Sequence, residues 1–246
     1  SSMDRVINKA PDRIAGLFDA IAGHYDSLNR FLSVGFDRRW RRRMVRSLGL
    51  TETQTVLDLC TGTADVAIAL CQAEPSCRRI IGVDFSTEML RHGQNKLNTQ
   101  GLISKVHLLR ADGTAVPLPS DSVDAATIAF GIRNIQNPMH ALLEIRRVVR
   151  PGGRLVILEF GMPTMPGIRT LYRWYFRRVL PWFGRLASGH DSAYSYLPRS
   201  VGEFPSGLAF CQLMEDAGFV ETRSHMLQFG IVYLYEGVRA RGLVAE

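Results

Sequence analysis

Cysteine and lysine are scarce in this sequence of 246 residues, and no long apolar run occurs. The four cysteines show no CxxC spacing, which argues against a disulfide framework and against a metal site. A transmembrane helix needs about 18 or more consecutive apolar residues, and no run reaches that length. The first residues, SSMDRVINKA, do not resemble a signal peptide, and Ser1 and Ser2 are expected to be a cloning remnant. We therefore expect a cytoplasmic protein.

Arginine carries nearly all of the positive charge. Only three of the thirty basic residues are lysine, the net charge is +7 and the isoelectric point is about 9.6. The planar guanidinium of arginine binds phosphates and carboxylates through paired hydrogen bonds. A net positive charge favours an anionic partner such as nucleic acid or lipid headgroups. A compositional bias of the genome would explain the excess of arginine equally well.

The hydrophobic pattern predicts a single α/β domain over residues 1–246. Helices are expected within residues 11–50 and at 64–73, 86–98 and 139–149, and strands at 54–60, 79–86, 105–112, 123–131 and 154–161. Alternating strands and helices at this spacing predict a parallel, doubly wound sheet. A helix that ends at Gly218 and two closing strands then predict an antiparallel hairpin. This is the layout of a class I methyltransferase, a Rossmann-like, seven-stranded and mainly parallel sheet, here with an N-terminal helical cap (1–50) and a substrate-side insertion (162–205).

Residues 56–67, VLDLCTGTADVA, have the form of a nucleotide-binding loop after a strand. A dinucleotide-binding loop needs glycine where Ala64 stands, and Asp65 would place a carboxylate where the pyrophosphate should bind. A Walker loop does not fit either, because no GK[ST] follows. The loop therefore favours a ligand without phosphate.

S-adenosylmethionine meets this condition, since it has no phosphate and its sulfonium and ammonium are positively charged. Asp58 and Asp65 would favour that cationic end, with a buried structural acid and a helix cap as the respective alternatives. Asp84, which follows Gly62 by 22 residues at the end of a strand, is placed for the ribose hydroxyls. Asp112 is placed for the adenine amino group. The residues predicted to bind the cofactor are Asp58, Gly62, Thr63, Asp65, Asp84, Phe85, Asp112, Gly113 and Ala129.

Several segments resemble the ubiquinone/menaquinone biosynthesis C-methyltransferase family. They are FDAIAGHYDSLNRFLSVGFDRRWRRR, VLDLCTGTADVA, GVDFSTEML, ADGTAVPLPSDSVDAATIAFGIRNIQNP, LLEIRRVVRPGGRLVILEF and YSYLPRSVGEFPSGLAFCQLMEDAGF. The resemblance spans about residues 15–240, and FGIRN and FDxIAxxYDxxN are its most specific parts. It implies methylation by S-adenosylmethionine of a ring carbon on a polyprenyl quinol, either demethylmenaquinol or the methoxybenzoquinol of ubiquinone synthesis.

The sequence departs from the family pattern at three places. Ala64 replaces the last glycine of GGTGD, and Ala129 replaces the serine of SFGxRN. Ser188-Gly189-His190 precedes the retained Asp191 where the family has NDADSYxYL. The last two departures lie in or near the expected quinol site.

Methyl transfer to carbon requires an activated ring, because the sulfonium methyl is already electrophilic. Arg133 and Asn134 follow the fourth strand; arginine is a poor base, so Arg133 is expected to stabilise phenolate charge or orient a water, with Asn134 as its hydrogen-bonding partner. The alternative for Arg133 is a structural ion pair. Tyr25 is expected over the cofactor, with a core aromatic as the alternative. Asp191 and His190 are the remaining proton-transfer candidates.

Two stretches suit a membrane surface, where a polyprenyl substrate would be found. Residues 169–185 mix five arginines with six aromatics, and residues 38–46 add six arginines. Such a helix can lie peripherally in the headgroup region at the inner face of the membrane, or it can line the substrate pocket, and both can hold. The oligomeric state is left open.

The sequence lacks the motifs of nucleic-acid methyltransferases. Amino-directed nucleic-acid methyltransferases place [DN]PP[YF] where FGIRN stands, and cytosine-C5 enzymes need a Pro-Cys nucleophile that does not occur here. Nucleic acid is therefore not expected as a partner. A C- or O-methyltransferase of a smaller phenolic natural product and a non-catalytic assembly protein that binds S-adenosylmethionine stay open. A hydrophobic tunnel lined from 165–200 would favour the prenylated substrate.

Overall fold

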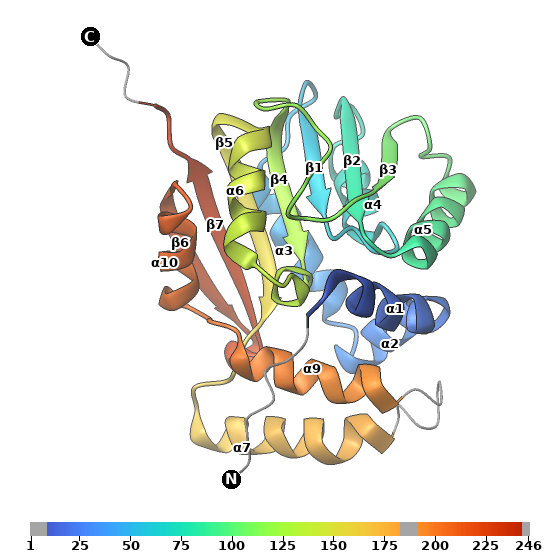
Figure 1. Cartoon of the computed structure of the whole chain (residues 1–246), viewed down its shortest axis with the longest axis vertical. Coiled ribbons are helices and arrows are strands. Elements are labelled where there is room, and N and C mark those ends of the chain that lie inside the picture. The colour runs from blue at the N-terminus through green and yellow to red at the C-terminus, as the bar shows by residue number, and fades with distance from the viewer. Residues whose placement is uncertain (1–8, 183–190, 243–246) are drawn as a thin grey trace.

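A seven-stranded sheet forms the centre of the protein, whose computed structural model describes residues 9–182 and 191–242. The strands are β1 (Thr55–Leu59), β2 (Arg79–Asp84), β3 (Val106–Arg110), β4 (Val123–Ala129), β5 (Val149–Phe160), β6 (Phe219–Leu227) and β7 (Val232–Arg239). Their order is β3-β2-β1-β4-β5-β7-β6, with β1 to β5 parallel and β6 and β7 forming an antiparallel hairpin that joins β5 (Figure 1). The predicted sheet and closing hairpin are confirmed.

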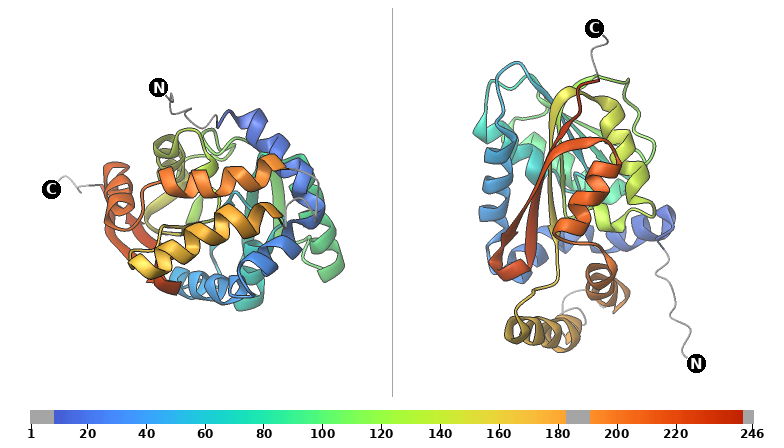
Figure 2. Two further views of the ribbon diagram at one scale, coloured as in Figure 1. Left: turned by 90° about the horizontal axis from the view of Figure 1, so that it is seen from below. Right: turned by 90° about the vertical axis from the view of Figure 1, so that its left-hand side faces the viewer.

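Helices cover both faces of the sheet and its carboxyl edge. They are α1 (Pro11–Ile21), η1 (Ala22–His24), α2 (Tyr25–Leu32), α3 (Asp37–Leu48), α4 (Asp65–Ala73), α5 (Thr87–Gln100), η2 (Ile132–Asn134), α6 (Pro138–Val148), α7 (Pro166–Trp174), the π-helical η3 (Tyr175–Val179), α9 (Asp191–Glu203), α10 (Leu208–Asp216) and η4 (Gln228–Gly230). Side chains of α3, α4 and α5 pack on one face, and those of α6 and α10 pack on the other (Figure 2).

Helix boundaries follow local chemistry. The Ser86 hydroxyl accepts the Met89 N–H and caps α5, which lies where the sequence predicts a helix at 86–98, and α5 ends at the left-handed Gly101. The segment Arg150-Pro151-Gly152-Gly153 follows α6 but is not the loop that the sequence predicted, because β5 begins at Val149 and runs through it. Val149 pairs with Val123 before a register shift, so the ladder with β4 continues through an irregularity.

The central strand β1 is buried on both faces. Its side chains alternate between the two layers, so that Leu57 joins the cluster under α6 and α10 while Val56 joins the cluster under α3 and α4. A parallel strand covered by helices on both faces reads as a continuous apolar run, which is why TVLDL is recognisable in the sequence. Asp58 interrupts that run and is only 1% exposed.

The carboxyl edge of the parallel strands carries the remaining helices. The arrowheads of β1, β2 and β4 point toward α1, α2 and α9, with α7 beyond them (Figure 1). Buried side chains of α7, η3 and α9 form a third cluster of Tyr172, Phe176, Leu180 and Val201. Within the described residues, no helix is both long enough and apolar enough to span a bilayer.

Candidate active site

A cavity of about 580 Å³ opens at the carboxyl ends of β1, β2, β3 and β4. It lies where β1 separates β2 from β4, the switch point at which doubly wound sheets bind ligands. Six of the nine predicted cofactor residues line it: Gly62, Asp84, Phe85, Asp112, Gly113 and Ala129. Tyr25, Asn134 and Lys9 also belong to its lining.

Asp84 ties the loop after β1 to the start of α5. Its Oδ2 accepts the Gly62 N–H and its Oδ1 accepts the Ser86 N–H, both at 2.9 Å. Burial raises the pKa of Asp84, while these backbone hydrogen bonds act in the opposite direction. With Asp112 on the same wall, the cavity offers carboxylates to hydroxyls and amino groups. These acceptor groups suit a nucleoside that has no phosphate and carries a cationic end.

The chain leaves β1 and β4 through residues with left-handed backbone. Cys60 follows β1 at φ 56° and Phe130 follows β4 at φ 56°, and both line the cavity. Ala64, where the family has glycine, has φ 68°. Gly131 must lack a side chain, because a Cβ there would lie 2.2 Å from that of Cys60. Backbone strain of this kind is typical of functional sites.

Asp58 lies beneath the loop and not in the cavity lining. Its Oδ2 accepts the Thr61 hydroxyl at 2.7 Å, and its Oδ1 accepts the Thr127 hydroxyl at 2.8 Å. It therefore joins β1 to β4 as a buried structural acid, the alternative that the sequence left open. Burial raises the pKa of Asp58 to about 7.

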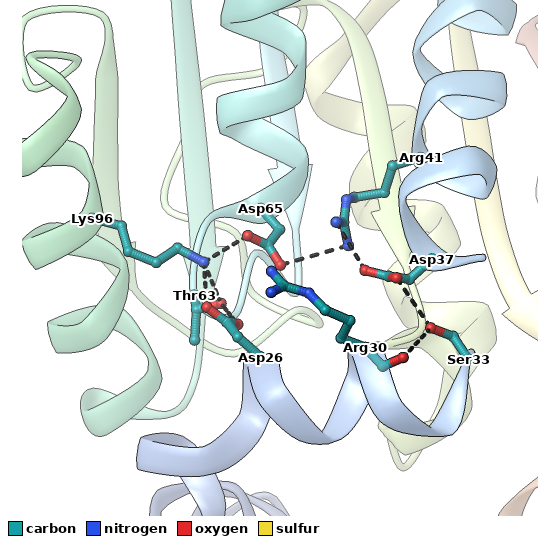
Figure 3. Close-up of polar contacts among 8 residues, drawn as sticks. All are labelled: Asp26, Arg30, Ser33, Asp37, Arg41, Thr63, Asp65 and Lys96. Atoms are coloured by element: carbon teal, nitrogen blue, oxygen red, sulfur yellow. Dashed lines mark hydrogen bonds and ion pairs between the residues drawn. The ribbon is translucent and has the colours of Figure 1, made fainter. Parts of the chain in front are cut away.

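Thr63 and Asp65 point away from the cavity into a charged cluster (Figure 3). Lys96 Nζ, from α5, lies 2.7 Å from Asp26 Oδ2 and 2.6 Å from Asp65 Oδ1. The Thr63 hydroxyl donates to Asp26 Oδ1 at 2.6 Å. We call Asp26, Thr63, Asp65 and Lys96 the latch, because they join α2 to the cofactor loop and to α5.

Arg41 extends this cluster to α3. Its guanidinium lies 3.5 Å from Asp65 and 3.0 Å from Asp37, whose Oδ1 accepts the Ser33 hydroxyl (Figure 3). On the other side of the cavity, Asp19 of α1 accepts the Ser86 hydroxyl. The N-terminal helices are thus held over the cavity by polar contacts on two sides.

A second cavity of about 490 Å³ adjoins the first. Phe18, Tyr25 and Phe130 line both, so the two cavities meet at these three aromatic side chains. The rest of the lining is mostly apolar and comes from α1, α2, α3, α7, η3 and α9. Burial raises the pKa of Tyr25, so its hydroxyl stays protonated at neutral pH.

Arg133 lines the second cavity and forms a buried ion pair. Its Nη1 lies 2.5 Å from Glu159 Oε1 at the end of β5, its Nε donates to Ser200 at 3.2 Å, and its guanidinium carbon lies 5.2 Å from the centre of the Phe160 ring. Arg133 is 4% exposed and Glu159 1%. Glu159 was not among the predicted site residues, although a single acid near the end of the apolar run LVILEF indicated a buried polar role for it.

Asn134 lines the first cavity, and its Nδ2 donates weakly to the Phe130 carbonyl at 3.5 Å. Its Oδ1 is buried and has no hydrogen-bond partner within the described ranges. Asp191 begins α9, and His190 lies outside the described residues, so their predicted roles remain predictions.

The sheet order and the acid-lined cavity at the switch point define a class I methyltransferase that uses S-adenosylmethionine. Solved structures share the fold. A putative methyltransferase bound to the Haloferax volcanii Trm112 activator has a TM-score of 0.65 and 20% identity, covering 91% of this chain and 98% of its own. A possible histamine N-methyltransferase from Thermotoga maritima has a TM-score of 0.65 and 19% identity, covering 92% and 99%.

The family model described as the ubiE/COQ5 methyltransferase family matches residues 6–239, and the chain belongs to this family. A Ubiquinone/menaquinone biosynthesis C-methyltransferase UbiE from Syntrophotalea carbinolica is 48% identical over 91% of this chain and 93% of its own length. A Demethylmenaquinone methyltransferase from Thermus thermophilus is 44% identical over 91% and 100%. The chain is therefore an enzyme, a C-methyltransferase that uses S-adenosylmethionine.

The latch predicts a specific effect on cofactor binding. In Lys96→Met, Asp26 loses its cation and faces Asp65, which keeps only the longer 3.5 Å contact with Arg41, so α2 should move away from the cavity. We expect the dissociation constant for S-adenosylmethionine to rise about tenfold, with Lys96→Arg near wild type and Lys105→Met as the matched control. Calorimetric titration gives the affinities. Unchanged affinity in Lys96→Met would show that the latch does not hold the cap in place.

The raised pKa of Asp58 predicts a pH effect on stability. The folded-state pKa is about 7 and the ordinary value is 3.8, so between them the folded state keeps a proton that the unfolded state has released. This contribution to the free energy of unfolding therefore falls as pH rises through that range. Asp58→Asn cannot ionise and should gain stability relative to wild type between about pH 4 and pH 8. Urea unfolding across this range is the measurement, with Asp12→Asn as the exposed control; parallel curves for Asp58→Asn and wild type would refute it.

Proposed function

We propose that the methyl acceptor is a ring carbon of a polyprenyl quinol, either demethylmenaquinol or the methoxybenzoquinol of ubiquinone synthesis. The names of the relatives point to quinone biosynthesis. The observation that carries the proposal is the mostly apolar second cavity, which adjoins the cofactor cavity and whose lining includes aliphatic and aromatic side chains from 168–176 and 196–197. A small phenol would not need such a lining.

The two cavities divide the reaction between them. The cofactor supplies an electrophilic methyl group, held on the side of Asp84 and Asp112. The acceptor ring lies at the shared aromatics Phe18, Tyr25 and Phe130, which exclude water and align the ring with the cofactor cavity. Its tail extends between α7 and α3.

The quinol hydroxyl gives its proton to solvent, and Arg133 stabilises the negative charge left on the ring oxygen. The proton of the methylated ring carbon also passes to solvent, as the ring becomes aromatic again. The guanidinium of Arg133 is held in place by Glu159, Ser200 and the Phe130 carbonyl. Glu159 is not among the residues that line either cavity, so the acceptor meets the guanidinium and not the carboxylate. In a dry apolar site such a preorganised charge is far more effective than in water.

A methyl-transfer assay tests the proposed function. The wild-type chain with S-adenosylmethionine should methylate one of the two reduced quinols offered side by side, and the product names the ring. Arg133→Met should lose about 10²–10³-fold in kcat while the affinity for S-adenosylmethionine stays unchanged. Absence of product from both quinols, together with methylation of a prenyl-free phenol, would replace the proposal by the smaller-substrate alternative.

Variants of the buried Arg133–Glu159 ion pair distinguish its effect on stability from its effect on catalysis. Arg133→Met leaves Glu159 buried and unpaired, which should cost about 3–5 kcal/mol of unfolding free energy. The double variant Arg133→Met/Glu159→Gln should recover much of that stability but none of the activity. Urea unfolding and the methyl-transfer assay give the two readouts. Recovery of activity in the double variant would remove Arg133 from the reaction.

We also propose that the enzyme takes its substrate from a membrane surface through the mouth of the second cavity. Val34, Leu171 and Trp174 line this cavity and are 82%, 63% and 56% exposed. Exposed arginines flank them on α7 and η3: Arg169, Arg173, Arg177 and Arg178. Apolar side chains at a cavity mouth beside guanidinium groups fit an anionic headgroup region, with the prenyl tail passing directly from lipid to cavity.

Vesicle sedimentation tests this surface. Wild type should sediment with anionic vesicles more than with neutral ones, and Leu171→Glu/Trp174→Glu should weaken binding about tenfold. Leu208→Glu, at an 82% exposed position on α10, is the matched control. Equal binding by the double variant and the control would place the contact elsewhere.

A further inference from the structure

Three buried polar atoms of the second cavity's lining have no hydrogen-bond partner within residues 9–182 and 191–242. They are the indole nitrogen of Trp40 on α3 and the hydroxyl oxygens of Tyr172 on α7 and Tyr196 on α9. Trp40 is 5% exposed and Tyr172 7%. Buried polar groups in folded proteins are nearly always paired, so each exception among the described residues leaves a position that an atom of a bound ligand can fill.

The two tyrosines belong to the same cavity lining as Arg133. Both hydroxyls are within the electrostatic reach of Arg133 and Glu159. Arg133 in turn donates to the carbonyl of Phe130, whose side chain lines both cavities. The two tyrosines therefore share a cavity lining with Arg133 and with Phe130, the residue that also faces the cofactor cavity.

Both hydroxyls are suited to donate hydrogen bonds. Burial raises the pKa of Tyr196 to about 12 and that of Tyr172 further still, so neither ionises near neutral pH. A neutral phenol in an apolar wall presents an O–H to whatever acceptor enters. The acceptor that matches this wall is an oxygen on an otherwise apolar molecule, because the surrounding lining is aliphatic and aromatic.

We propose that the hydroxyl groups of Tyr172 and Tyr196 bind the oxygens of the acceptor's ring, and thereby select a quinol or quinone over an oxygen-free ring of the same shape. The inference rests on the proposed function, since it names the groups that hold the ring of that substrate. It assigns binding roles to two residues that are separated from Arg133 along the chain and reach it only in the fold.

This arrangement gives the cavity a basis for specificity. A site that leaves buried hydroxyls unpaired rejects an analogue lacking the matching oxygens, whereas an apolar wall distinguishes shapes only weakly. Donation to a ring oxygen also strengthens as that oxygen gains negative charge, so the tyrosines assist Arg133 without accepting a proton.

The experiment compares two probes on the full chain. One is a naphthoquinone with a short prenyl tail, and the other is the same prenylated naphthalene without its oxygens. Binding is followed by quenching of tryptophan fluorescence, since Trp40 and Trp174 line the cavity. The variants are Tyr172→Phe, Tyr196→Phe and the double variant. Tyr175→Phe is the matched control, because Tyr175 lines the same cavity and its hydroxyl is not among the buried unpaired atoms.

We expect wild type to bind the naphthoquinone at least about tenfold more tightly than the naphthalene. Each single variant should lower that ratio about fivefold, and the double variant should bring it near one, with naphthalene affinity unchanged throughout. Unchanged naphthalene affinity also reports that the variants are folded.

Two results would overturn the inference in distinguishable ways. If the double variant keeps the wild-type ratio, or wild type binds both probes equally, the tyrosines do not select ring oxygens, and the proposed function is unaffected. If wild type binds neither probe, the quinol assignment fails and the tyrosine assignment fails with it.

Discussion

The strands β1 and β4 are hydrogen-bonded neighbours, yet the chains that leave them turn to opposite sides of the sheet. This divergence opens the cleft in which both cavities begin. Asp58 and Thr127 bond the two strands just beneath it, and Cys60 and Phe130 bend the chain away through left-handed backbone. The residues that line the two cavities lie at the rim of this cleft or on the helices that cover it.

Charge is divided between the two sides of the cleft. The cofactor side carries Asp84 and Asp112 beside Lys9, a formally negative set that suits a ligand with a cationic end. The second cavity carries Arg133 beside the ion pair of Asp37 and Arg41, a formally positive set that suits the proposed ring as it becomes anionic. Only aromatic side chains, Phe18, Tyr25 and Phe130, are common to the two linings. An apolar partition keeps the opposite charges from neutralising one another and leaves them free to act on the reactants.

The sequence predicted the sheet well because its signals are local. A buried parallel strand is a continuous apolar run, and a cap such as Ser86 lies next to the helix that it starts. Strand-end residues such as Asp84 and Asp112 reach the cavity because the carboxyl ends of parallel strands share an edge. Asp65 has the same local appearance, but its surroundings are set by Lys96 and Arg41 from other helices, and these draw it away from the cavity.

Contacts between segments that are distant in the chain could not be predicted from the sequence, because sequence patterns are local. Glu159 and Ser200 contact Arg133 across 26 and 67 positions of the chain, and although the single acid of LVILEF marks Glu159 as unusual, no local pattern identifies Arg133 as its partner. Tyr172 and Tyr196 were not among the predicted site residues, because a sequence pattern reports burial and not the absence of a partner for a hydroxyl. What fixes the acceptor site is thus tertiary packing of α7 and α9 over the end of β5, which no local rule describes.

The buried Arg133–Glu159 pair shows why that packing matters. An ion pair this deep gives little net stability, because apolar side chains of similar volume often do as well or better. Its value lies in holding a permanent positive charge at a fixed place in a dry cavity. In the reaction that we propose, the apolar lining that would hold the prenyl tail also excludes water around that charge, and this exclusion would make the guanidinium more effective against a developing phenolate. In this proposal, the lining of the second cavity therefore determines both which substrate fits and how strongly Arg133 acts on it.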